Sequence, residues 1–160
     1  MPNEKRPIGF WIINMFLAFS VIVLLLGQTT SLFAYDLAVR LGLQEHVDEV
    51  TVFGVEVNRA FGASDTAVYI PLMLISLVGL FLKKRWALVT TAAVMGVSVY
   101  WALTVAAMLV FLTGVPGYQL VHGLEYWVFL GAYMLFGIWG ILYLAFRSDE
   151  LFGKGSAPIG

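Results

Sequence analysis

The chain has 160 residues, of which 61% are hydrophobic and only 12% are charged, and its mean hydropathy is +0.90. A soluble domain has about 25% charged residues, so this composition predicts a membrane protein. The net charge of −1, with no basic run longer than three residues, argues against a nucleic-acid partner. The absence of cysteine excludes disulfides, thiolate metal sites and cysteine nucleophiles.

Four long segments carry no charged side chain, at residues 8–35, 66–82, 86–121 and 126–146. A helix of roughly 20 apolar residues crosses a hydrocarbon core about 30 Å thick. Helices are favoured because backbone polar groups in lipid must be paired within their own segment. The first segment is too long for the core of a secretion signal. We therefore expect one all-α domain, a four-helix transmembrane bundle with spans at about 8–30, 66–82, 86–112 and 124–146.

Lysine and arginine gather at one end of these predicted spans. The residues at that end are Lys5, Arg6, Lys83, Lys84, Arg85, Arg147 and Lys154. Cytoplasmic loops carry an excess of basic residues, so both termini and the short loop at 83–85 are expected in the cytoplasm. Residues 31–65 would then form a helical or mixed extracytoplasmic cap between the first two spans.

The predicted cap contains two ambiguous stretches. Asp36 and Arg40 are four residues apart, so they can pair on one face of a helix that continues the first span or lies at the membrane surface. Residues 50–61 fit either a helix or a short hairpin, because their apolar positions match both periods. We favour a helix there.

The start of the second span has its own signals. Ser64 or Asp65 is expected to be its N-cap, since these residue types accept hydrogen bonds from the first helical turn. Pro71 is expected to kink or loosen the outer turn of this span, because proline lacks a backbone donor and clashes with the carbonyl of Ala67.

Polar residues gather near the outer ends of the spans, where an antiparallel bundle would bring them to one depth. The candidate ligand-binding residues are Gln28, Thr29, Asp36, Asp65, Tyr100, Thr104, His122 and Glu125. The alternative for Gln28 and Thr29 is solvation by lipid headgroups, since polar residues cost little free energy at span ends.

His122 and Glu125 are three residues apart, so they share a helix face and can chelate a metal, with His46 completing the shell. The alternative is that Glu125 favours the positive helix N-terminus while His122 bonds a loop carbonyl. A di-metal bundle needs two Glu-x-x-His helices and two further glutamates, which this chain lacks. We expect no metal and assign no cofactor.

The last two spans carry residues suited to packing. Small residues at Ala92, Gly96, Ala102 and Ala106 permit close helix approach in the third span. An aromatic stripe follows the fourth span at Tyr126, Phe129, Tyr133, Phe136 and Tyr143. Such a stripe is usually core or lipid-facing, and a cofactor pocket is the less frequent alternative.

The runs GQTTSLFAYDLAVRLGLQE, FGASDTAVYIPLMLISLVGLFLKKRWAL and VYWAL resemble small four-helix prokaryotic membrane proteins of the DoxX-like kind. The pattern Asp-Thr-x-x-Tyr-Ile-Pro-Leu at 65–72 is the most particular part of this resemblance. It implies a four-helix bundle in a prokaryotic plasma membrane and carries no agreed activity or catalytic residues. Sterol-isomerase-like bundles are a more distant resemblance. They would have acids at mid-depth in several spans, and this chain has none there.

Three functions remain open. The first and favoured one is a non-enzymatic accessory or assembly subunit, whose partner is another membrane protein or a second copy of the chain. The second is a binding protein for a lipid, quinone or other apolar small molecule in an outward-facing cavity. The third is a membrane enzyme with Glu125 or Asp65 as acid or base beside His122. No serine–histidine–aspartate order, phosphate loop or nucleotide fingerprint supports a particular enzyme class.

Overall fold

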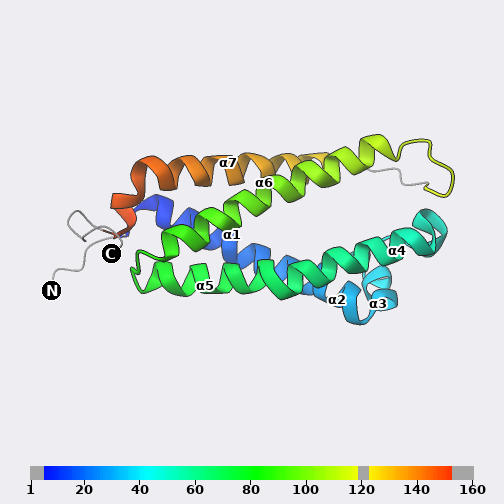
Figure 1. The fold of residues 1–160 in the computed structure, drawn as a ribbon, viewed down its shortest axis with the longest axis horizontal. Helices are drawn as coiled ribbons and strands as arrows, with labels where there is room; N and C mark the ends of the chain where they lie inside the picture. Colours follow the sequence, from blue (N-terminus) through cyan, green and yellow to red (C-terminus); the bar gives the residue numbers. More distant parts are fainter. Residues whose placement is uncertain (1–5, 119–122, 153–160) are drawn as a thin grey trace.

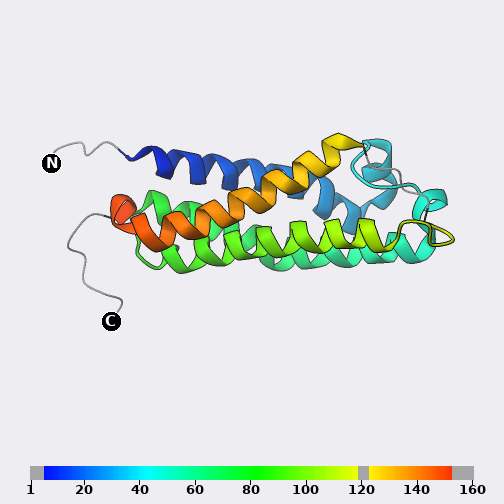
Figure 2. The same ribbon diagram turned by 90° about the horizontal axis from the view of Figure 1, so that it is seen from above.

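The computed structural model describes residues 6–118 and 123–152, and within these ranges the chain is helical and contains no strand. Four helices are long and apolar enough to cross a membrane: Ile8–Phe33, Val47–Phe81, Ala87–Phe111 and Leu124–Phe152. They run along one common long axis in both views (Figures 1 and 2). The predicted all-α architecture is therefore confirmed, and its four apolar helices are those of a multi-pass membrane protein.

The first long helix is built from three segments. α1 (Ile8–Leu24) continues into the π-helical turn η1 (Leu25–Thr29) and then into α2 (Thr30–Phe33). It ends at Ala34, whose φ of −150° and ψ of 64° are not helical. α3 (Tyr35–Arg40) follows, and Gly42 at φ +69° lets the Leu43 N–H donate to the Ala38 carbonyl at 2.9 Å.

The second long helix begins earlier than the sequence predicts. It comprises α4 (Val47–Ser64), the π-helical turn η2 (Asp65–Tyr69) and α5 (Ile70–Phe81). The preference for a helix at 50–61 is confirmed. The predicted N-cap is wrong, because Ser64 (φ −64°, ψ −43°) and Asp65 (φ −65°, ψ −42°) both lie inside the helix. Residues with good capping side chains can also sit in a helix interior when the preceding chain is already helical.

The true start of α4 is at His46, whose Nδ1 accepts from the Asp48 N–H while Glu49 accepts from the His46 N–H, a capping box. One residue interrupts this helix near its start. Thr51 has φ 61° and ψ 173°, so α4 bends there. The loosened turn expected before Pro71 is found as η2, where the Ile70 N–H donates to the Asp65 carbonyl five residues back.

α6 (Ala87–Phe111) and α7 (Leu124–Phe152) complete the bundle. α1 packs on α5, α5 packs on α6, and α6 packs on α7. Their shared core is a set of fully buried side chains: Phe10, Ile13, Leu17, Met73, Val94 and Met95. A Cβ on Gly137 would lie 2.7 Å from the Met95 carbonyl oxygen, so α6 and α7 approach closely there. Gly96, by contrast, has nothing within 4 Å of its Cβ position, so this predicted packing residue is open.

The two ends of the bundle differ in character. At the basic end, which carries the loop at 82–86, the Arg6 guanidinium donates to the carbonyls of Leu80 (3.0 Å) and Phe81 (2.7 Å) and so caps the C-terminus of α5. At the other end, called the distal end below, lie α2, α3, the start of α4 and the end of α6 (Figure 1). The core there is a smaller cluster formed mainly by α6 and α7, with Ala102, Leu109 and Leu130. This cluster does not fill the space toward α1 and α4.

Candidate ligand-binding cavity

A cavity of about 400 Å³ lies at the distal end, between the first two long helices and the last two. Its walls come from the end of α1, η1, residues 42–45, α4, η2, α6 and α7. The aromatic side chains that line it are Phe61, Tyr69, Trp101, Tyr118, Tyr126, Phe129 and Tyr133. The cavity thus joins residues that are up to 110 positions apart in the chain.

The polar lining residues are mostly hydrogen-bond acceptors or amides: Gln28, Gln44, Glu45, Glu49 and Asn58. None of the described lining residues is lysine, arginine or histidine. The described lining is therefore mostly apolar and rich in aromatic rings, and its charged residues are acidic.

One wall is built by helical spacing on α7. Tyr126, Phe129 and Tyr133 lie three and four residues apart, so they share one helix face. The Phe129 and Tyr133 ring centroids are 4.8 Å apart, and Trp101 of α6 lies 5.8 Å from Tyr133 and 6.3 Å from Phe129. Rings at 4.5–7 Å attract one another, so this wall is a packed aromatic surface.

The predicted aromatic stripe therefore divides in two. Its first three members line the cavity, which was the less frequent of the two interpretations. The other two belong to the core: Phe136 stacks on Phe16 at 4.1 Å, and Tyr143 packs against Gly9.

Two tyrosine–serine hydrogen bonds hold the floor of the cavity. The Tyr133 hydroxyl donates to Ser20 Oγ at 2.7 Å and joins α7 to α1. The Tyr69 and Ser98 hydroxyls are 2.5 Å apart and join η2 to α6. Hydrogen bonds between membrane helices restrict their rotation and sliding. Both tyrosine rings are therefore held in place while they line the cavity.

The two π-helical turns meet beside this floor. Thr29 Oγ1 and Thr66 Oγ1 are 2.9 Å apart, and a Cβ on Gly62 would lie 2.5 Å from the Gln28 carbonyl oxygen. Asp65 is only 5% exposed, and among the described residues its Oδ2 has no hydrogen-bond partner. The Oε1 of Gln28 likewise has no partner in the described part of the chain. Of the predicted site residues Gln28, Thr29 and Asp65, only Gln28 lines the cavity, while Thr29 contacts Thr66, the residue after Asp65.

The other predicted site residues lie elsewhere. Asp36 is exposed and lines a separate cavity with Arg40, and no described ion pair joins these two side chains. Tyr100 is 69% exposed on the outer face of α6. Thr104 is half-buried and Glu125 is exposed, and neither lines the distal cavity. His122 lies outside the described residues.

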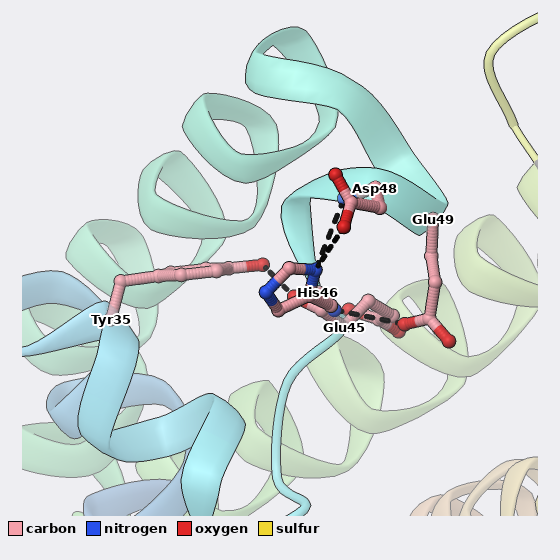
Figure 3. A network of polar contacts seen from close by, with 5 residues as sticks. All are labelled: Tyr35, Glu45, His46, Asp48 and Glu49. Atoms are coloured by element: carbon pink, nitrogen blue, oxygen red, sulfur yellow. Dashed lines mark hydrogen bonds and ion pairs between the residues drawn. The ribbon is translucent and has the colours of Figure 1, made fainter.

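Hydrogen bonds order the rim of the cavity. Asn58 Nδ2 donates to Glu45 Oε2 at 2.7 Å and to the Tyr35 hydroxyl at 3.1 Å. That hydroxyl in turn donates to the Glu45 carbonyl oxygen at 3.1 Å (Figure 3). Burial raises the pKa of Tyr35, and the negative charge of Glu45 adds to this effect while the Asn58 hydrogen bond opposes it. Hydrogen bonds to its main-chain carbonyl and to its side-chain carboxylate therefore hold Glu45 in position.

The adjoining capping box orients Glu49. Its Oε2 accepts from the His46 N–H at 2.8 Å, and the Asp48 N–H donates to His46 Nδ1 at 3.3 Å (Figure 3). His46 thus caps α4. Among the residues that the structure describes, no group of three or more His, Asp or Glu side chains is placed to hold a metal ion.

Several lining residues were not foreseen. Glu45 and Glu49 belong to a charged run that resembles an ordinary solvated segment. Trp101 follows Tyr100 directly, and neighbouring helical residues point about 100° apart, so the helix rotation decides which of them faces inward. The Tyr126–Tyr133 spacing was the one available signal.

Comparisons of the chain with protein-family models, with curated proteins and with solved structures found no match. The resemblance to DoxX-like proteins therefore stays a prediction, and the functional argument depends on the cavity.

Proposed function

We propose that this chain is a multi-pass membrane protein that binds an apolar or amphipathic small molecule in the distal cavity. The observation that supports this is a space of about 400 Å³ lined by aromatic rings, with amides and carboxylates among its polar groups. Small-molecule sites have volumes of about 300–1,000 Å³ and combine a mostly apolar wall with a few polar groups. The function thus differs from the favoured sequence-based expectation of an accessory subunit and agrees with its first alternative.

The depth of the cavity suits an amphipathic ligand. Tyr133 at the floor lies nine residues after Leu124, about 14 Å along α7 at 1.5 Å per residue. Glu45 precedes α4 and Glu49 is in its first turn, so both lie at the distal end. A ligand would place its apolar body among the rings and keep its polar group near the carboxylates and amides.

The proposal is tested by filling the cavity. Val105 of α6 lines it, whereas Val110 of the same helix is 58% exposed on the outside of the bundle. We expect Val105→Trp to abolish co-purification of a small molecule and Val110→Trp to preserve it. Native mass spectrometry of protein released from nanodiscs measures the bound mass directly.

The contradicting result is equal bound mass in the two variants, or none in the wild type under gentle purification. Because a tryptophan can disturb folding, Val105→Phe serves as a milder filling variant. All proteins are compared only where their thermal unfolding temperatures agree.

A second candidate function, the accessory subunit, is favoured by one feature of α6. Val89, Gly96, Tyr100 and Leu103 follow one face of this helix, and that face is open. Tyr100 lies 13 residues after Ala87, about 20 Å along the helix, and its hydroxyl has no hydrogen-bond partner among the described residues. A phenol in lipid without a partner costs free energy, which a neighbouring membrane protein or a second copy would offset. The same native spectrum would show either one as added protein mass.

For the enzyme alternative, Glu125, one of its two candidate acids, does not line the distal cavity. For the location, we infer a prokaryotic plasma membrane with the basic end in the cytoplasm. Arg6, Lys83, Lys84 and Arg147 support this orientation by the positive-inside rule. The distal cavity would then open away from the cytoplasm.

A further inference from the structure

We infer that the ligand of the distal cavity is a lipophilic organic cation, such as an amine or quaternary ammonium with an apolar body. This rests on the proposed binding function and adds the chemical class. The inference combines three properties of the lining: its aromatic surface, its unneutralised negative charge and its unpaired acceptors.

The aromatic surface favours cations over other apolar ligands. Trp101, Phe129 and Tyr133 form a continuous cluster with ring centroids 4.8–6.3 Å apart. Ring faces carry negative potential, and tryptophan attracts cations most strongly. A cation within about 6 Å of these rings gains an interaction that a neutral or anionic molecule does not.

The negative charge at the cavity is not neutralised by a described cation. Glu45 and Glu49 line the cavity, and neither forms an ion pair with a lysine or arginine among the described residues. The described hydrogen bonds of each side chain use only one carboxylate oxygen, Oε2. The second oxygen of each remains available for a ligand.

Glu45 also acts on the cavity electrostatically. Tyr118, which lines the same cavity, has its pKa raised by burial first and by the charge of Glu45 second. Glu45 itself lines the cavity, so its charge also acts on a charged ligand there. Low-dielectric walls strengthen this field relative to water.

The unpaired acceptor is Gln28 Oε1, which is buried and lacks a donor among the described residues. A buried acceptor without a partner costs free energy until a donor reaches it. Protonated amines supply such donors, which quaternary ammonium ions lack, whereas quinones, fatty acids and phosphate esters bring mainly acceptors. The polar groups of the cavity thus complement a donor or a cation.

The probes are tetraphenylphosphonium and tetraphenylborate, which share one shape and differ in the sign of their charge, and triphenylphosphine oxide, a neutral relative with three phenyl rings. Binding is measured by equilibrium dialysis against protein in nanodiscs, with empty nanodiscs subtracted for partition into lipid. We expect tetraphenylphosphonium to bind at least 100-fold more tightly than tetraphenylborate and at least 10-fold more tightly than the neutral oxide.

The carboxylates are then removed one at a time. Glu45→Gln is expected to weaken tetraphenylphosphonium binding about 10-fold and to leave binding of the neutral oxide within about twofold. Glu49→Gln is expected to do the same to a smaller degree. The control is Glu56→Gln, since Glu56 is on α4 like Glu49, pairs with Arg59 and does not line the cavity.

The outcomes separate the two proposals. If all three probes bind with similar affinity and Val105→Trp removes them all, the cation inference is overturned and the binding function stands. If none of the probes binds above empty nanodiscs, or if Val105→Trp leaves their binding unchanged, the cation inference is overturned, and the binding function is then decided by the mass that co-purifies with the wild type and with Val105→Trp. Stronger binding of tetraphenylborate than of tetraphenylphosphonium would overturn the cation inference alone.

Discussion

At the scale of single residues, Asp65 is the least expected feature of the molecule. Its side chain is 5% exposed, and its Oδ2 has no hydrogen-bond partner in the described chain. An isolated carboxylate in an apolar setting is costly because it loses hydration without gaining a partner. Asp65 is the first residue of the π-helical turn η2, beside η1. Such turns frequently occur at functional sites.

Replacing this carboxylate with an amide of the same size should increase stability. We expect Asp65→Asn to raise the free energy of unfolding by about 1–2 kcal/mol at neutral pH, because an amide costs less to bury than a charge. Thermal unfolding in detergent measures the change, with exposed Asp36→Asn as the control. A lower unfolding temperature for Asp65→Asn alone would show that the carboxylate has a stabilising partner.

Between helices, the contact of α4 with the first long helix depends on a single glycine. A Cβ on Gly62 would lie 2.5 Å from the Gln28 carbonyl oxygen and 2.7 Å from Ser31 Oγ. Real Cβ atoms do not approach other heavy atoms this closely, so any side chain at this position would force the helices apart. The same approach brings Thr29 Oγ1 within hydrogen-bond distance of Thr66 Oγ1.

A pair of glycine substitutions tests this close approach. We expect Gly62→Ala to destabilise the protein by about 1–3 kcal/mol, because overpacking requires backbone shifts. Gly96→Ala should instead be neutral or stabilising by up to about 1 kcal/mol, since its Cβ meets nothing within 4 Å and alanine favours helix. Unfolding by denaturing detergent compares the two variants. Equal losses would contradict a special role for Gly62 and would show that Gly96 is also closely packed, against a partner on α6.

For the whole molecule, the arrangement separates a tightly packed basic end from a distal end with a cavity. Core side chains from all four long helices meet at the basic end, including Phe10, Met73, Met95 and Leu144. The distal core joins mainly α6 and α7, so the two halves of the bundle are less connected there. Ligand access at the distal end would therefore leave the packed end undisturbed.

The inferred orientation can be measured on intact cells, because the chain has no cysteine of its own. Asp48 at the distal end and Lys84 at the basic end are both exposed. We expect a membrane-impermeant maleimide to label Asp48→Cys from outside, and Lys84→Cys only after permeabilisation. The reverse pattern would invert the topology, and labelling of both sites in intact cells would contradict a fixed one.

The number and place of the apolar helices could be predicted from the sequence. Length and absence of charge are local properties, and the thickness of the hydrocarbon core converts them into spans. The start of the second helix could not be located in this way. The capping side chains of Ser64 and Asp65 resemble a helix start, but the chain arrives already helical from His46 and packs Gly62 against Gln28. Capping signals depend only on neighbouring residues, so they carry no information about a contact between residues far apart in the sequence.

What the sequence by itself determined is the all-α class, the four apolar helices and the candidate polar residues. Only the tertiary structure decided which of these residues meet, because the rotation of each helix about its axis depends on its neighbours. That rotation turns Trp101 inward and Tyr100 outward, and places Gln28 in the cavity lining while leaving Glu125 exposed. The cavity itself arises from the incomplete packing of distant segments, a property of the assembled bundle.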